Sequence, residues 1–194
     1  MKDIIRPALA LFAITAAFTM ILAVTDFLTT DIIAEAREQS RLASMSYVLP
    51  GTSNFGQQID APTDIAGMVG YTIGFDSGGE PVGVVVQMSV TAWSPNLVFL
   101  VGVDVDGTVI GLDVISHTET PGLGSRITDE AYRHQFIGAT GNVRVLTRGT
   151  PGENEVMAIT GATITMQVVA DGVNDALEFV NDVILPNIHR YMPR

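Results

Sequence analysis

The chain has 194 residues, 47% of them apolar, which is enough for one membrane anchor and one domain with a sizeable core. It contains no cysteine, so disulfides, iron–sulfur ligation and thiol nucleophiles are excluded. Its net charge of −11 argues against nucleic acid as a partner, because phosphate contacts need a positive surface.

A long apolar segment follows the N-terminus. The nineteen residues 7–25 carry no charge, and at about 1.5 Å per residue they would cover roughly 30 Å, one hydrocarbon thickness. We therefore predict a transmembrane helix over residues 7–28; a cleaved signal peptide is the alternative, although this apolar run is longer than is usual for one. Basic residues precede the helix and acidic residues follow it, which predicts that residues 1–6 are cytoplasmic and that the remaining domain is extracytoplasmic.

The next segment, residues 29–64, is predicted to be a stalk helix and a linker. Apolar residues recur on a roughly helical spacing until Pro50-Gly51, where a helix should stop. Residues 52–64 lack periodicity and are rich in small polar residues, which is typical of a linker.

Strand patterns dominate the first half of the domain predicted over residues 65–185. Two hairpins are expected: residues 67–76 with 83–93 around a Gly-rich turn, and residues 97–104 with 109–116 around Asp106-Gly107. Four antiparallel strands are the consequence.

Helices are expected in the second half. Residues 128–138 predict a short helix with Thr128 as its N-cap, residues 142–147 a short strand, and residues 163–181 a longer helix with an apolar stripe. The fold class is therefore predicted as α+β, an antiparallel sheet packed with helices, followed by a C-terminal tail over residues 186–194.

The stretch AITGATIT, residues 158–165, lies where the chain enters the last helix. Small side chains at Gly161 and Ala162 allow a ligand to approach the backbone, and a helix N-terminus favours an anion such as phosphate. The stretch has neither the lysine of a P-loop nor a GxGxxG fingerprint. The alternative is that Thr160 or Thr163 simply caps the helix.

A second candidate, SHTETPGLGSRI, spans residues 116–127 at the end of a predicted strand. His117 and Glu119 are two residues apart, and the turn around Leu123 should expose backbone amides that could hold a planar ring. One His and one Glu make a weak metal site, and nothing pairs a nucleophile with a base. The alternative is a plain loop with a solvated His117.

Taken together, the apolar anchor, residues 102–124 ending in ETPGLG, and TGATIT at 160–165 resemble the FMN-binding G subunit of the Rnf ion-translocating electron-transport complex. A relative of that subunit is the C subunit of the sodium-pumping NADH:quinone oxidoreductase. The order and spacing of the two motifs make the resemblance specific.

The resemblance implies that FMN is attached covalently, through its phosphate, to Thr163. A flavin transferase that uses FAD and a divalent metal would form this bond. The other implied FMN-binding residues are Thr160, Gly161, Ala162 and Thr165 around the phosphate and ribityl chain, and His117, Glu119, Thr120, Leu123 and Gly124 near the ring or ribityl chain. No catalytic residue and no metal ligand is predicted.

The implied function is a membrane-anchored electron carrier in the cell membrane of a bacterium or archaeon, working with the other redox subunits of the complex. The alternatives are the C subunit of the sodium pump and a non-redox binding or regulatory module of the same fold. Two positions depart from the family pattern. Met157 stands where the family pattern has an acidic residue in many members, and we expect this change to impair flavinylation if the transferase needs that carboxylate. Residues 92–97 stand where the family tends to have a Gly-rich turn, and they include Trp93, a candidate aromatic contact to the flavin.

Overall fold

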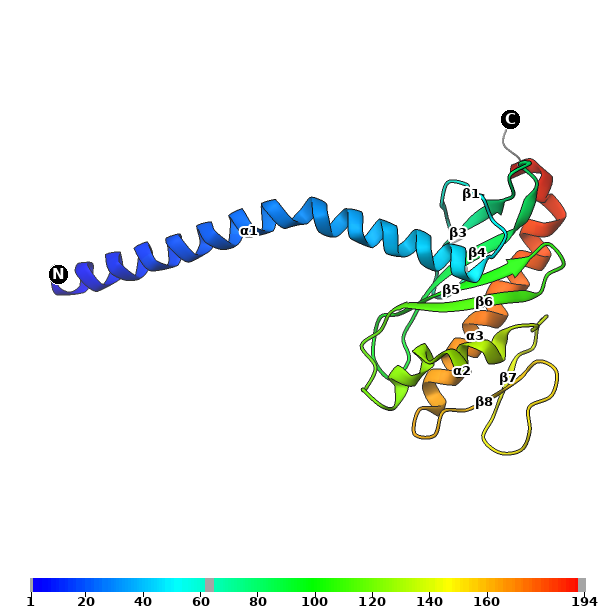
Figure 1. Ribbon diagram of the computed structural model, residues 1–194. Coiled ribbons are helices and arrows are strands. Elements are labelled where there is room, and N and C mark those ends of the chain that lie inside the picture. Colours follow the sequence, from blue (N-terminus) through cyan, green and yellow to red (C-terminus); the bar gives the residue numbers. More distant parts are fainter. Residues whose placement is uncertain (1, 62–64, 192–194) are drawn as a thin grey trace. The chain divides into compact units, whose positions relative to one another are not determined.

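The computed structural model describes residues 2–61 and 65–191, and the chain divides into two compact units, Met1–Leu42 and Ala43–Arg194 (Figure 1). Helix α1 runs without interruption over Lys2–Val48, so the two helices predicted before Pro50 form a single element. Among the helices of the described ranges, none has the length and hydrophobicity that a membrane crossing requires, and the span predicted over residues 7–28 is not confirmed.

An antiparallel sheet forms the centre of the second unit. Its four long strands are β3 (Met68–Phe75), β4 (Pro81–Val90), β5 (Leu97–Asp104) and β6 (Val109–Ser116), which neighbour one another in chain order. The two predicted hairpins are therefore confirmed. Two short strands, β1 (Asn54–Phe55) and β2 (Ile59–Asp60), pair with β3, so the predicted linker contains strand structure that its polar composition did not indicate.

Both faces of this sheet are covered. Along β4, Val84, Val86 and Met88 belong to the main core, whereas Val85 belongs to a smaller cluster with Val48 and its neighbours at the end of α1. This alternation is the expected period of two for a strand. On the face towards the smaller cluster, Gly102 and Gly111 are paired across β5 and β6, and a Cβ on either would collide with the backbone of Val48.

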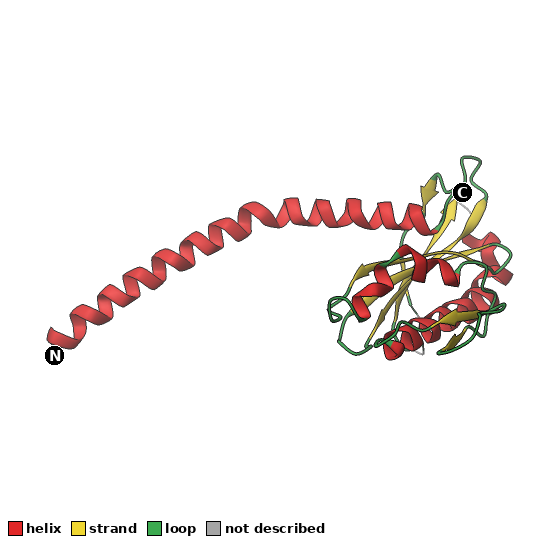
Figure 2. Ribbon diagram, turned by 60° about the horizontal axis from the view of Figure 1, so that its bottom comes forward, coloured by secondary structure: helices red, strands yellow, loops and turns green. Residues whose placement is uncertain are grey.

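The long C-terminal helix α3 (Thr163–Phe179) lies along the main-core face of the sheet (Figure 2). Its buried apolar stripe confirms the predicted amphipathic pattern. The chain continues through a π-helical turn, Val180–Ile184, into a 3₁₀ helix, Leu185–Tyr191, so part of the predicted tail is helical. The hydroxyls of Tyr71 and Tyr191 lie 3.2 Å apart in a hydrogen bond, which ties this end to β3.

The helix predicted over residues 128–138 is shorter than expected and is only partly α-helical. A 3₁₀ helix (Gly124–Thr128) precedes α2 (Glu130–Arg133), and a second 3₁₀ helix (His134–Phe136) follows it. Thr128 is not the N-cap, because its hydroxyl donates to the carbonyl of Ser125 inside the first 3₁₀ helix. That prediction was wrong because the local chain tightens into 3₁₀ geometry before α2 begins.

A small parallel pair, β7 (Arg144–Leu146) and β8 (Glu155–Met157), completes the unit. The sequence predicted a strand at β7 but none at β8, whose three residues are too few to show a periodic pattern.

Asp175 is a half-buried carboxyl on α3. Burial, together with the carboxylates of Asp171 and Glu178, raises the pKa of Asp175. The folded protein therefore binds this proton more tightly than the unfolded chain, and the charged form destabilises the fold above the raised pKa. Asp175→Asn should increase the free energy of unfolding at neutral pH by about 0.5 kcal/mol, the size of one or two like-charge helix pairs.

Urea denaturation of the full chain in detergent measures this difference. The gain should disappear near pH 3, below the ordinary aspartate pKa of about 3.9, where both states are protonated. Asp106→Asn, in the exposed β5–β6 turn, is the control and should show no gain at either pH. An equal gain at both pH values would contradict the electrostatic explanation.

Candidate functional site

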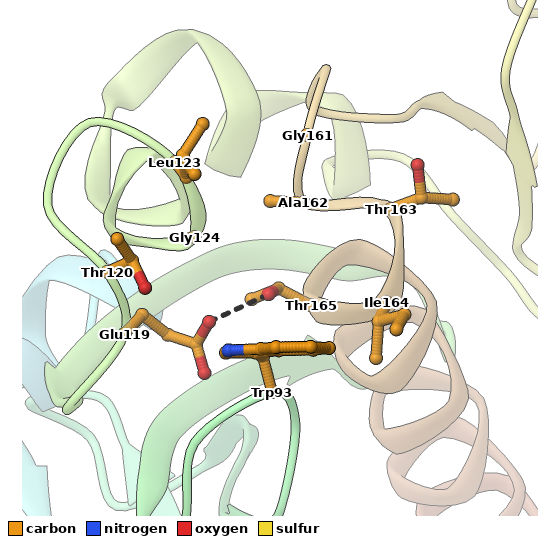
Figure 3. A pocket seen from close by; sticks show the side chains of 10 residues that line it. All are labelled: Trp93, Glu119, Thr120, Leu123, Gly124, Gly161, Ala162, Thr163, Ile164 and Thr165. Carbon is orange, nitrogen blue, oxygen red and sulfur yellow. Dashed lines mark hydrogen bonds between the residues drawn. The ribbon is translucent and has the colours of Figure 1, made fainter.

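A cavity of about 420 Å³ lies between the loop that follows β6 and the beginning of α3. Figure 3 shows the side chains that line it. They come from three segments far apart in the sequence: Trp93 between β4 and β5, Glu119, Thr120, Leu123 and Gly124 after β6, and Gly161, Ala162, Thr163, Ile164 and Thr165 at the start of α3. The sheet positions the first two segments, because β4, β5 and β6 are hydrogen-bonded neighbours.

Helix α3 begins at Thr163, and Ala162 is its N-cap residue. Within the part of the chain that the structure describes, this helix start has no side-chain capping hydrogen bond, so capping by Thr160 or Thr163 is wrong. The first backbone N–H groups of an α-helix have no acceptor within the helix, and they can bind an anion. Thr163 itself is an exposed residue.

The glycine before this helix is required by the backbone. Gly161 has φ +83°, a left-handed conformation that other residues rarely adopt. A Cβ at this position would also lie 3.0 Å from Cδ2 of Leu123 on the opposite wall. The turn closes with a 2.8 Å hydrogen bond from the Ala162 N–H to the Ile159 carbonyl. Gly161 thus permits a close approach of the two walls.

Glu119 joins the three segments through its carboxylate. The backbone N–H of Ser94 donates to Oε1 at 3.0 Å, and the hydroxyl of Thr165 donates to Oε2 at 2.9 Å. The side chain is only 5% exposed. A Cβ at position 124 would collide with Oε2, so Gly124 is the residue that lets the loop close around the carboxylate.

The loop that carries Trp93 is hydrogen-bonded to the segment that follows β6. Besides the Ser94 bond, the hydroxyl of Thr118 donates to the Pro95 carbonyl at 2.6 Å. The indole of Trp93 is nevertheless 73% exposed. In Figure 3 it lies between Glu119 and Ile164, as part of the cavity wall. An exposed aromatic ring is therefore presented on a loop that is hydrogen-bonded in place.

Eight of the ten residues predicted to bind FMN line this one cavity. Thr160 and His117 are not among the lining residues; Thr160 is exposed, and His117 is half-buried. The buried Nδ1 of His117 has no hydrogen-bond partner among the described residues. Ile164 lines the cavity but was not predicted, because an exposed isoleucine on a helix gives no distinguishing signal in the sequence.

Met157 lies in β8 and is not among the residues that line the cavity. Its backbone N–H donates to the side-chain carbonyl of Gln135. Met157 is thus attached to the helical segment that follows α2.

Comparisons with known proteins agree with this geometry. Residues 93–178 match the FMN-binding domain, and residues 1–48 match the RnfG N-terminal region. The G subunit of the Na⁺-translocating ferredoxin:NAD⁺ oxidoreductase complex of Acetobacterium woodii is 31% identical over 91% of this chain and 91% of that protein. The chain belongs to the RnfG family, the G subunits of Rnf ion-translocating complexes.

Another RnfG relative is the G subunit of the ion-translocating oxidoreductase complex of Methanosarcina acetivorans, which is 30% identical over 93% of this chain and 96% of that protein. Among solved structures, NqrC of Shewanella oneidensis aligns with a TM-score of 0.46 and 25% identity, over 70% of this chain and 65% of that chain.

Proposed function

We propose that this RnfG chain carries FMN attached through its phosphate to Thr163, and that it relays electrons between redox subunits of an Rnf-type complex. The observation that carries the proposal is the cavity itself, which brings the loop at Glu119–Gly124 to the start of α3. The match to the FMN-binding domain over residues 93–178 includes both motifs.

The start of α3 suits a phosphodiester. Such a group keeps a negative charge, and the helix N-terminus stabilises an anion without a lysine. The exposed hydroxyl of Thr163 can be reached by a flavin transferase, and Gly161 leaves room beside it. The residues at this end of the cavity would hold the phosphate and the first part of the ribityl chain.

The rest of the cavity suits a flat ring. Its walls include the exposed apolar side chains of Trp93, Leu123 and Ile164. Its volume of about 420 Å³ lies within the roughly 300–1,000 Å³ usual for ligand pockets. FMN would supply the electron-accepting chemistry, and these side chains would orient the ring and exclude water from it.

The names of the relatives favour a complex that transfers electrons between ferredoxin and NAD⁺, since that reaction is named for the Acetobacterium woodii protein. The translocated ion differs among the relatives: sodium is named for that protein and the proton for the one from Clostridium ljungdahlii. The match of residues 1–48 to the RnfG N-terminal region supports membership of an Rnf complex rather than of a sodium-pumping NADH:quinone oxidoreductase.

The direct test is covalent flavin on the full chain. When the chain is coexpressed with a flavin transferase, its band on a denaturing gel should fluoresce under ultraviolet light, and its mass should increase by one FMN less one water. The same chain expressed without the transferase is the control. A non-fluorescent band of unchanged mass in both samples would refute the carrier and favour the non-redox module.

We also propose that the apolar N-terminal segment attaches the protein to the membrane, with the N-terminus cytoplasmic. The support is a group of large apolar side chains on α1, each more than half exposed, that need a non-aqueous partner. They are Ile5, Leu11, Phe12, Ile14, Phe18, Met20, Ile21, Leu22, Val24, Phe27 and Leu28.

Alkaline carbonate extraction of membranes tests this attachment. The full chain should stay in the pellet, whereas the double variant Phe18→Arg/Leu22→Arg should move to the supernatant, because each arginine costs about 2.5–3.5 kcal/mol at the centre of a membrane helix. The control is Gln39→Arg/Ser40→Arg, which adds the same charge further along α1 and should stay in the pellet. Release of the unaltered chain by carbonate would contradict the proposal.

A further inference from the structure

We propose that the buried carboxylate of Glu119 lowers the reduction potential of the flavin held in this cavity. The inference rests on the proposed function, because it concerns the same site. It assigns to one wall residue an electrostatic role that is separate from holding the cofactor.

The first support is the position of the carboxylate. Glu119 is one of the residues that line the cavity, and it is almost fully buried. Hydrogen bonds from Ser94 and Thr165 fix both of its oxygens, so its charge has a defined place in the wall. In Figure 3 the carboxylate lies beside the indole of Trp93.

The second support is that this charge is not paired. The ion pairs found among the described residues do not include Glu119, and its two hydrogen-bond donors are neutral groups. Buried charges are ordinarily paired, because removing an ion from water is costly. An unpaired buried carboxylate is therefore an exception, and such exceptions are expected at functional sites.

The third support is the character of the surrounding wall. Trp93, Leu123 and Ile164 are apolar, and a bound ring would displace water from between them and the carboxylate. Coulomb interactions become stronger as the effective dielectric constant falls. The charge of Glu119 would therefore act on the ring with little screening.

The negative charge of Glu119 determines the direction in which the midpoint potential of the flavin shifts. Two-electron reduction moves two electrons from the reductant onto the ring and takes one proton from water, so the ring gains one net negative charge, and no bond to Glu119 forms or breaks. Because the ring gains electron density beside a fixed negative charge, the reduced form is destabilised relative to the oxidised form. The consequence is a more negative midpoint potential.

The experiment compares the FMN-loaded full chain with Glu119→Gln and Glu119→Asp. Each protein is titrated with dithionite, which supplies the electrons and is itself oxidised, and absorbance at each solution potential gives the midpoint. Glu119→Gln keeps a hydrogen-bonding group of the same shape. It should favour the reduced form at least tenfold, which is a positive shift of about 30 mV for a two-electron couple. Glu119→Asp keeps the charge and should stay near the unaltered protein.

The emission of Trp93, the single tryptophan of the chain, reports separately whether the cavity wall is intact in each variant. Equal midpoints for all three proteins, with equal tryptophan emission, would overturn the proposal. An equal midpoint shift in Glu119→Gln and Glu119→Asp would also overturn it, because only the first variant removes the charge and the shift would then come from altered geometry. If the unaltered chain takes up no FMN, the proposed function fails and this inference fails with it; equal midpoints in FMN-loaded proteins refute the inference alone.

A second pair of variants keeps the proposal testable if Glu119→Gln does not fold. Leu123→Lys places a positive charge in the same wall, and Leu123→Met is its neutral control. A more positive midpoint for the lysine variant than for the methionine variant supports an electrostatic role for the wall. Equal midpoints would show that a charge in this wall does not affect the flavin, and they would overturn the proposal.

Discussion

Thr163→Ala should abolish the covalent flavin completely, because the bond requires the hydroxyl oxygen of that side chain. The substitution removes only an exposed side chain at the start of α3, which has no capping bond to lose in the described structure. Its effect on stability should therefore stay within about 0.5 kcal/mol. In-gel fluorescence and intact mass after coexpression with a flavin transferase measure the label.

Two control variants identify the residue whose hydroxyl oxygen is bonded to FMN. Thr163→Ser keeps a hydroxyl and should be labelled, and Thr160→Ala should be labelled because Thr160 lies outside the cavity lining. Tryptophan emission and circular dichroism confirm that each variant is folded. A label that survives in Thr163→Ala would move the attachment to Thr160 or Thr165 and contradict the assignment.

Gly124→Ala should strongly reduce flavin incorporation by forcing the loop away from Glu119. The new Cβ would collide with a carboxylate oxygen that is already held by Ser94 and Thr165. Overpacking of this kind costs about 1–3 kcal/mol, and relief by loop movement would open the cavity between α3 and the loop. The fraction of labelled protein and the urea midpoint should both fall.

The control is Gly152→Ala in the loop between β7 and β8. At that position a Cβ would meet only Oε2 of Glu155, at 3.4 Å, and the backbone φ is not left-handed. Both labelling and stability should be close to those of the unaltered chain. If Gly124→Ala behaves like this control, the loop does not depend on close packing around Glu119.

The main strands and the last helix were predictable from local pattern. Alternating or continuous apolar runs bounded by Gly-rich turns predicted β3 to β6, and the apolar stripe predicted α3. These elements carry their signal within their own residues. By contrast, β1, β2 and β8 are two or three residues long and exist because β3 or β7 lies beside them. Pairing with a distant partner leaves little trace in a short segment.

The candidate site divides in the same way. The sequence alone pointed to residues 119–124 and 161–165. A Pro-Gly turn and small residues beside a helix start are each recognisable from a few neighbouring residues. The hydrogen bonds from Ser94 and Thr165 to Glu119, which join segments 25 and 46 residues apart, could not be predicted from the sequence. The same holds for Ile164 in the cavity wall and His117 outside it. Backbone preference acts over a few neighbours, whereas the cavity forms only when the sheet and α3 pack together.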